Sequence, residues 1–123
     1  MKKYVRIQVR YTGKTGKPVG IFGACHHVVH SSYHPFNATD DDRKLFKEIE
    51  DWFELHLPNP PFYAEGNPEK YITWFKTEKA GMMIEKLTPL MKLLEKYAVP
   101  YDIVYTDSAG TIVYEDEFQI AVK

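Results

Sequence analysis

The sequence predicts an α+β fold, with an antiparallel or mixed sheet of four to five strands and two or three helices packed mainly on one face. Three patterns carry this prediction. Apolar and polar residues alternate over 4–11, apolar residues recur every three or four positions over 40–56, and a strand, a turn and another strand follow from 102 to 122. With 123 residues, 44% of them hydrophobic, the chain is expected to form a single globular domain over 1–123.

The N-terminal elements are a strand followed by an ambiguous segment. The alternation over 4–11 is typical of a half-buried strand, and the glycines and charges of 12–17 indicate a turn or loop. Pro18 suits the first position of a helix, but the glycines and valines of 18–32 are poor helix formers. We expect a helix over 18–32. The alternative is that residues 19–22 close a hairpin with the first strand.

The clearest helix begins after Thr39. Thr39 is a good N-cap, and the three aspartates at 40–42 place negative charge where the helix dipole favours it. An apolar stripe continues to residue 56, where Pro58 stops it. The next segment, 57–68, holds too many prolines for a regular element and is expected to be a stiff loop.

The C-terminal half predicts one more helix between strands. Residues 71–75 are dense in strand formers with large apolar groups on both faces, which indicates a central strand. An apolar stripe over 83–97 predicts a helix that Pro89 kinks or divides. The segments 102–106 and 111–122 are expected to be a strand and a long or bent strand of a β-meander.

Asp116 is unusual within this last segment. Strict alternation would place it on the same face as Ile112 and Phe118, where an apolar residue belongs. We expect a turn or bulge at 115–117 to restore the pattern, because charged residues are rarely buried unpaired. If Asp116 were buried instead, it would need a partner such as Lys76, Arg6 or a histidine, and its shifted pKa could serve acid–base chemistry.

Charge is distributed unevenly along the chain. The net charge is −1, yet residues 1–39 hold six of the sixteen Lys and Arg and none of the seventeen Asp and Glu. Such asymmetry can mark a face that binds anions, although the two fields largely cancel if the basic segment packs beside the acidic one. The single cysteine, the absence of a signal-like N-terminus and the absence of a long apolar run predict a cytoplasmic protein that does not span a membrane.

Three histidines form the candidate metal site. His26, His30 and His34 are spaced by four, so a helix would align them, and two imidazoles at this spacing can bind zinc. No His-Glu-x-x-His or Cys-x-x-Cys pattern supplies the remaining ligands. The interpretation that these are ordinary surface or core histidines is therefore favoured. No cofactor is predicted beyond this weak candidate for a zinc site.

Basic and aromatic residues form the candidate ligand-binding set. Arg6 and Arg10 share one face of the first strand, while Lys14 and Lys17 lie in a Gly-Lys loop that could hold an anion or a nucleotide but lacks the full phosphate-loop spacing. A stiff proline-rich loop presents an aromatic pair suited to recognition, unless these rings fold back onto the core. That pair is Phe62 and Tyr63.

The preferred hypothesis is a non-catalytic binding or accessory protein that uses the basic N-terminal third and the aromatic loop. One alternative is a small metal- or histidine-dependent hydrolase of the phosphoester class, with His26 and His30 as ligands or acid–base groups and Asp116 as an orienting group. A second is an anion or nucleotide sensor acting through the Gly-Lys loop. A protein or anionic partner fits the preferred hypothesis, nucleic acid is a weaker candidate partner, and a sheet face left uncovered by 18–32 would favour a homodimer.

Overall fold

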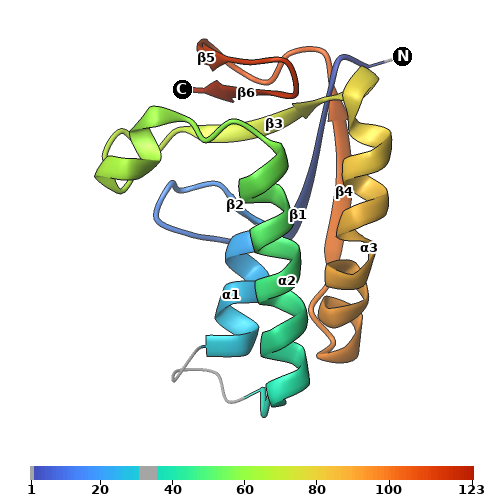
Figure 1. The fold of residues 1–123 in the computed structure, drawn as a ribbon. Helices are drawn as coiled ribbons and strands as arrows, with labels where there is room; N and C mark the ends of the chain where they lie inside the picture. Colours follow the sequence, from blue (N-terminus) through green and yellow to red (C-terminus); the bar gives the residue numbers. More distant parts are fainter. Residues whose placement is uncertain (1, 31–35) are drawn as a thin grey trace.

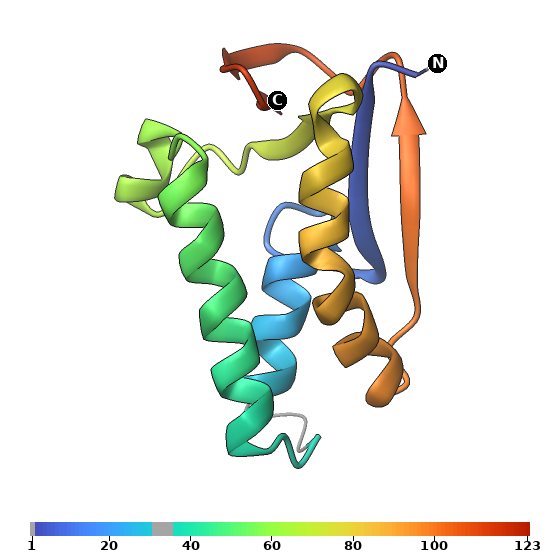
Figure 2. The same ribbon diagram turned by 45° about the vertical axis from the view of Figure 1, so that its right-hand side comes forward.

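The computed structural model describes residues 2–30 and 36–123. Within these residues, three α-helices form a layer against one face of a six-stranded sheet, and every strand pair is antiparallel (Figures 1 and 2). The predicted α+β class and the placement of the helices are confirmed, with one strand more than expected. The helices are α1 (Ile21–His30), α2 (Asp40–His56) and α3 (Ala80–Lys96), and the strands are β1 (Tyr4–Thr12), β2 (Pro18–Gly20), β3 (Ile72–Lys76), β4 (Tyr101–Thr106), β5 (Ile112–Glu115) and β6 (Gln119–Val122).

Strand β1 organises the sheet. One of its edges pairs with β4 over 4–9, while its other edge is shared by β3 and β2. From β3 the sheet continues to β6 and then β5. The alternation predicted for β1 is confirmed, because Val5, Ile7 and Val9 are buried in the core while the residues between them are partly exposed.

The predicted C-terminal meander is wrong. Strand β4 pairs with β1, whereas β5 and β6 form a separate hairpin that joins the sheet at β3. The segment after β4 does not turn back on that strand. It packs on the end of β6 instead, where a Cβ on Gly110 would lie 3.2 Å from the Cβ of Val122. The expected turn near Asp116 is confirmed, since β5 ends at Glu115 and β6 begins at Gln119.

The segment after the first loop holds both of the elements that were expected as alternatives. Residues 18–20 pair with β1 to close a short hairpin, and α1 follows immediately. The helix expected from residue 18 therefore begins three residues later, because Pro18 and Gly20 are taken up by strand pairing. Its expected end at residue 32 lies outside the described residues.

Helix α2 begins as predicted. The hydroxyl of Thr39 accepts a hydrogen bond from the Asp42 N–H, and the Asp42 carboxylate accepts one from the Thr39 N–H, which completes a capping box. The helix ends at His56, just before Pro58. The proline-rich loop that follows contains a short 3₁₀ helix, η1 (Pro61–Glu65), closed by Gly66 in the left-handed conformation.

Helix α3 supplies the centre of the core. Its predicted stripe is confirmed, because Met83, Leu87, Leu90 and Leu94 are all almost completely buried. Pro89 lies inside this helix but does not divide it, contrary to one of the two expected outcomes. The helix instead continues through the proline, and the Thr88 hydroxyl donates a hydrogen bond to the Ile84 carbonyl one turn earlier.

Apolar residues gather on both faces of the sheet. The larger cluster joins β1 to all three helices, so α1 lies in the helix layer and does not cover the opposite face. A smaller cluster of Ile72, Ile120 and Val122, with Tyr4 and Trp74 packed against it, lies on the other face. The β3–β6 end of that face is thus covered by the chain's own residues.

A buried carboxylate ties the start of α2 to the end of α3. Asp42 is 7% exposed, and its oxygens accept hydrogen bonds from the Lys96 ammonium at 2.9 and 3.0 Å and from the Tyr97 hydroxyl. Burial alone would raise the pKa of Asp42, but hydrogen bonds from Tyr97, Lys96 and Thr39 outweigh it and hold the pKa well below its usual range. We call Thr39, Asp42, Lys96 and Tyr97 the Asp42 cluster.

Candidate functional site

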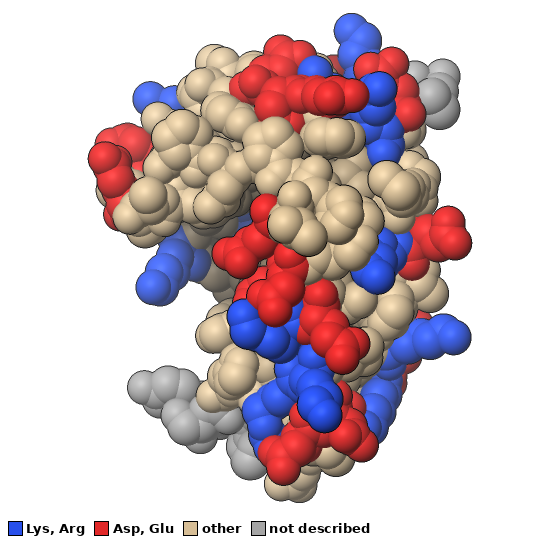
Figure 3. Space-filling model, in the orientation of Figure 1, with Lys and Arg blue, Asp and Glu red and all other residues tan. Residues whose placement is uncertain are grey.

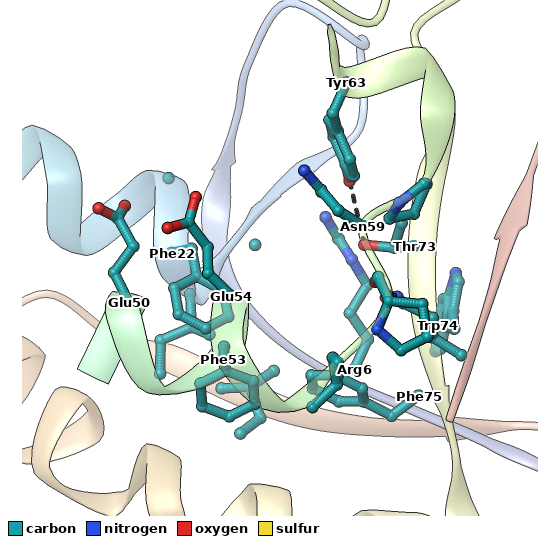
Figure 4. A pocket seen from close by; sticks show the side chains of 18 of the residues that line it. Arg6, Phe22, Glu50, Phe53, Glu54, Asn59, Tyr63, Thr73, Trp74 and Phe75 are labelled. Carbon is teal, nitrogen blue, oxygen red and sulfur yellow. Dashed lines mark hydrogen bonds between the residues drawn. The ribbon is translucent and has the colours of Figure 1, made fainter. Parts of the chain in front are cut away.

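The candidate site is a pocket at a split in the sheet. On one edge, β1 pairs with β3 at Tyr4 and Val5 and with β2 only from Gln8 onwards. Between these pairings, Arg6 and Ile7 have no described strand beside them on that edge. A pocket of about 470 Å³ occupies this position, bounded by β1, β3, the β2–α1 junction, α2 and the proline-rich loop (Figure 4).

The pocket has two polar walls of different character and an aromatic floor. One wall carries hydrogen-bond donors from β1, the proline-rich loop and β3, and the opposite wall carries two α2 carboxylates (Figure 4). In the floor, the Phe22 and Phe53 rings meet edge to face at 5.1 Å, and Phe53 stacks on Phe75 at 6.2 Å. The donor wall consists of Arg6, Asn59, Tyr63 and Thr73, and the carboxylate wall consists of Glu50 and Glu54.

Arg6 is the principal charged group of the donor wall. Its Nη1 donates to the Gln8 side-chain oxygen at 2.8 Å and to the Pro18 carbonyl at 2.7 Å. Burial lowers the pKa of Arg6, and the neighbouring Tyr63 side chain opposes this effect. The ion pairs among the described residues do not include Arg6, whereas Arg10, four residues along the strand, pairs with Asp102 at 3.2 Å. Arg6 therefore brings a positive charge to the pocket without a carboxylate against it.

Gly20 allows the Arg6 side chain to take this position. The guanidinium lies over the end of β2, and a Cβ on Gly20 would lie only 3.1 Å from the Arg6 Nη2. Such a contact is closer than nine in ten contacts of real Cβ atoms, so a larger residue at position 20 would require the guanidinium to shift by a few tenths of an ångström.

The two rings of the aromatic loop have different positions. Phe62 is half-buried and packs on Tyr63, Tyr71 and Tyr114, with centroid distances of 4.7, 5.1 and 6.3 Å. Tyr63 stays exposed and lines the pocket, where its hydroxyl donates to the Thr73 hydroxyl at 3.5 Å. Phe62 therefore anchors the loop, and Tyr63 presents its polar end to the pocket.

The structure brings Arg6 and Tyr63 together but leaves the other predicted binding residues elsewhere. Arg10 is engaged with Asp102, and Lys14 and Lys17 lie in the exposed β1–β2 loop. In that loop, the N–H groups of Gly13 and Gly16 donate to carbonyls of the loop itself. The Gly-Lys loop leads into a strand, so it does not present the helix N-terminus that favours phosphate binding.

The candidate histidine site is incomplete in the described residues. His26 and His30 are exposed on α1 with ring centroids 4.8 Å apart, and His34 lies outside the described residues. The described part of the chain contains no group of three metal-ligating side chains. Cys25, beside His26, is buried with its thiol directed at the Leu90 carbonyl, and burial raises its pKa to about 12.

Asp116 is used by the turn that contains it. Its carboxylate accepts hydrogen bonds from the Tyr114 hydroxyl, from the N–H groups of Phe118 and Gln119, and from the Gln119 side chain, at 2.8 to 3.1 Å. This turn belongs to the β5–β6 hairpin, which both views place at the opposite end of the molecule from the C-terminal part of α1 (Figures 1 and 2). The structure does not bring Asp116 to the histidines.

Basic residues of the N-terminal third lie beside acidic residues of later segments. Lys2 pairs with Asp107 at 3.7 Å, and Arg10 pairs with Asp102. On the face shown in Figure 3, Lys and Arg side chains alternate with Asp and Glu side chains. Among the described residues, no helix combines the length and apolar character needed to cross a bilayer.

Several pocket residues escaped the sequence analysis. Glu50 and Glu54 lie one helical turn apart, with the buried Phe53 between them in the sequence. Two like charges at this spacing slightly destabilise a helix, which is only a weak indication of a functional role. Asn59 and Thr73 carry no local signal. Comparisons with protein-family models, curated proteins and solved structures found no match.

Proposed function

We propose that this protein is a non-catalytic binding protein that takes a ligand with a carboxylate or phosphate group into the pocket between β2 and β3. Arg6 is the group that recognises the anion. The observation that carries the proposal is a partly buried guanidinium, without a described carboxylate partner, at a pocket of about 470 Å³. Ligand pockets of this size typically combine apolar walls with a few convergent polar groups.

The donor wall supports an anion more than any other ligand group. A guanidinium binds carboxylates and phosphates through two parallel hydrogen bonds, and Nη2 of Arg6 makes none of the hydrogen bonds described for this side chain. The Asn59 amide and the Tyr63 and Thr73 hydroxyls add donors around it. The proline-rich loop, held by Phe62 and Gly66, gives this wall a defined shape before the ligand arrives.

The rival hypotheses draw less support from the geometry. A hydrolase built on His26, His30 and Asp116 requires Asp116 to lie beside the two histidines, and the structure holds it at the other end of the molecule. An anion sensor acting through the Gly-Lys loop requires N–H groups that already bond within that loop. The proposal keeps the anionic ligand but assigns its recognition to Arg6.

The test is a titration of the protein with inorganic phosphate and with phenylacetate, followed by calorimetry and by the chemical shifts of the Trp74 indole. We expect saturable binding that Arg6→Gln weakens by about 10-fold to 100-fold, the equivalent of about 1.5–3 kcal/mol for hydrogen bonds to a charged group. Arg10→Gln, on the same strand but outside the pocket, is the matched control and is expected to bind normally. Equal affinity in folded Arg6→Gln protein, or no saturation by either anion, would refute the proposal.

A further inference from the structure

The carboxylate wall opposite Arg6 is not accounted for by an anionic ligand alone. Glu50 is half-buried and Glu54 is exposed, and both line the pocket. Neither is a member of any ion pair among the described residues. The lysine nearest in sequence, Lys47, has its ammonium 2.7 Å from Asp51 instead. Asp51 is the main cause of the raised pKa of Lys47, and Glu50 and Glu54 add to it, so Lys47 offsets only part of the repulsion between these two carboxylates one helical turn apart. A bound cation would relieve the rest.

The two charged walls are too far apart to neutralise each other. No oxygen of Glu50 or Glu54 lies within the 4.0 Å of an Arg6 nitrogen that defines an ion pair. Figure 4 shows the two carboxylates on one side of the pocket, with Asn59, Tyr63 and Thr73 on the other. Neither carboxylate contributes to the pKa of Arg6. A single ligand that pairs with both walls must therefore carry both a cation and an anion.

We infer that the ligand is a short peptide of two or three residues, with its free carboxylate on Arg6 and its free ammonium between Glu50 and Glu54. This inference rests on the proposed function. Each residue of an extended peptide spans about 3.3–3.6 Å, so two or three residues place the terminal charges further apart than a single α-amino acid, which holds both charges on one carbon. A peptide of this length suits a pocket of about 470 Å³ with charges on opposite walls.

The split in the sheet favours a peptide over other zwitterions. The edge of β1 at Arg6 and Ile7 has no described strand beside it, and an extended peptide bonds to such an edge through its own backbone. The aromatic floor of Phe22, Phe53 and Phe75 matches an apolar side chain between the two charged ends.

The experiment compares three forms of each peptide in a small set of di- and tripeptides built from Ala, Leu and Phe. The forms are the free peptide, its N-acetyl derivative and its C-terminal amide, and binding is measured by calorimetry. We expect at least one free peptide to bind, with a loss of about tenfold or more on acetylation and on amidation. In Glu50→Gln/Glu54→Gln protein, the free and acetylated forms should bind equally. Glu48→Gln, exposed on the same helix outside the pocket, should keep the preference for the free amine.

The outcomes separate this inference from the proposed function. If phosphate or phenylacetate binds through Arg6 but no peptide does, the peptide inference fails and the proposed function stands. The same conclusion follows if free and acetylated peptides bind equally to the wild-type protein. If neither the anions nor the peptides respond to Arg6→Gln, both fail. Thermal unfolding of each variant shows whether a loss of binding reflects a loss of the fold.

Discussion

Substitution of Asp42 by Asn tests whether the Asp42 cluster joins α2 to α3 through a negative charge. The variant keeps the size of the side chain and one acceptor oxygen but loses the charge. Hydrogen bonds to charged groups contribute about 1.5–3 kcal/mol. The Lys96 side chain is 52% exposed, so its ion pair with Asp42 adds less than about 1 kcal/mol. We expect Asp42→Asn to lower the free energy of unfolding by about 2–3 kcal/mol.

The measurement is urea unfolding followed by circular dichroism, with the slope of the free energy against urea checked for equality between variants. For a chain of this size, a loss of 2–3 kcal/mol corresponds to a fall in Tm of roughly 6–15 °C. Asp41→Asn is the matched control, because Asp41 lies in the same first turn and shares the helix-dipole effect but is exposed. If Asp42→Asn costs no more than Asp41→Asn, the cluster does not stabilise the fold as we describe.

The pH dependence of the difference in free energy of unfolding between wild type and Asp42→Asn gives a second check. The pKa of Asp42 is lower in the folded protein than its unfolded value of about 3.9, so the unfolded state takes up the proton first as the pH falls. The contribution of the ionised Asp42 carboxylate to the free energy of unfolding is therefore complete above about pH 5 and declines progressively below pH 4. A stability difference between wild type and Asp42→Asn that stays constant from pH 7 to pH 2.5 would contradict the assignment to the carboxylate.

Three further predictions follow from individual residues. Pro89→Ala restores an N–H that can donate to the Glu85 carbonyl within the continuous helix α3. We expect this substitution to raise the free energy of unfolding by about 1–2 kcal/mol, because the gain in the helix is partly offset by the greater conformational freedom of the unfolded chain. An unchanged or lower Tm would count against this expectation. Cys25 is buried, and burial raises its pKa to about 12, so a thiol-reactive disulfide reagent at pH 8 should label it only after unfolding. Labelling of the native protein at the rate of a free thiol would contradict the structure. Gly20→Ala should weaken phosphate binding several-fold by displacing the Arg6 guanidinium, and unaltered affinity would show that the guanidinium does not need this position.

Local patterns in the sequence predicted most of the elements. The Thr39 cap, the alternation of β1 and the apolar stripe of α3 could be recognised because each reports burial or hydrogen bonding within a few residues. The turn near Asp116 was also predictable, because an unpaired buried carboxylate is costly.

The order of the strands could not be derived in the same way. The pairing of β4 with β1 joins residues about 90 to 100 positions apart, and no short pattern encodes it. A turn signal at 107–110 fits a hairpin and a crossing loop equally well, which is why a meander was expected. In the segment 18–32, strand pairing at Pro18 and Gly20 competed with helix formation, and tertiary context decided the boundary.

The pocket was predictable only in part. Arg6 and Tyr63 both belonged to the predicted binding set, because a basic strand and a stiff aromatic loop are recognisable in the sequence. Glu50 and Thr73 were missed because each is ordinary in its own element and acquires significance only beside residues far away in the chain. The split in the sheet that creates the pocket has no signature in the sequence.

The long separation between β1 and β4 has a consequence for how the protein is made. At synthesis rates of about 5–20 residues per second, roughly 5–20 s pass between the emergence of β1 and that of β4. The β1–β2 hairpin can form within microseconds, but one whole edge of β1 must wait for its partner, exposing N–H and C=O groups to other chains. The pocket exists only once β3 has joined β1, so a ligand cannot assist the earliest steps and instead stabilises the molecule after its sheet has closed.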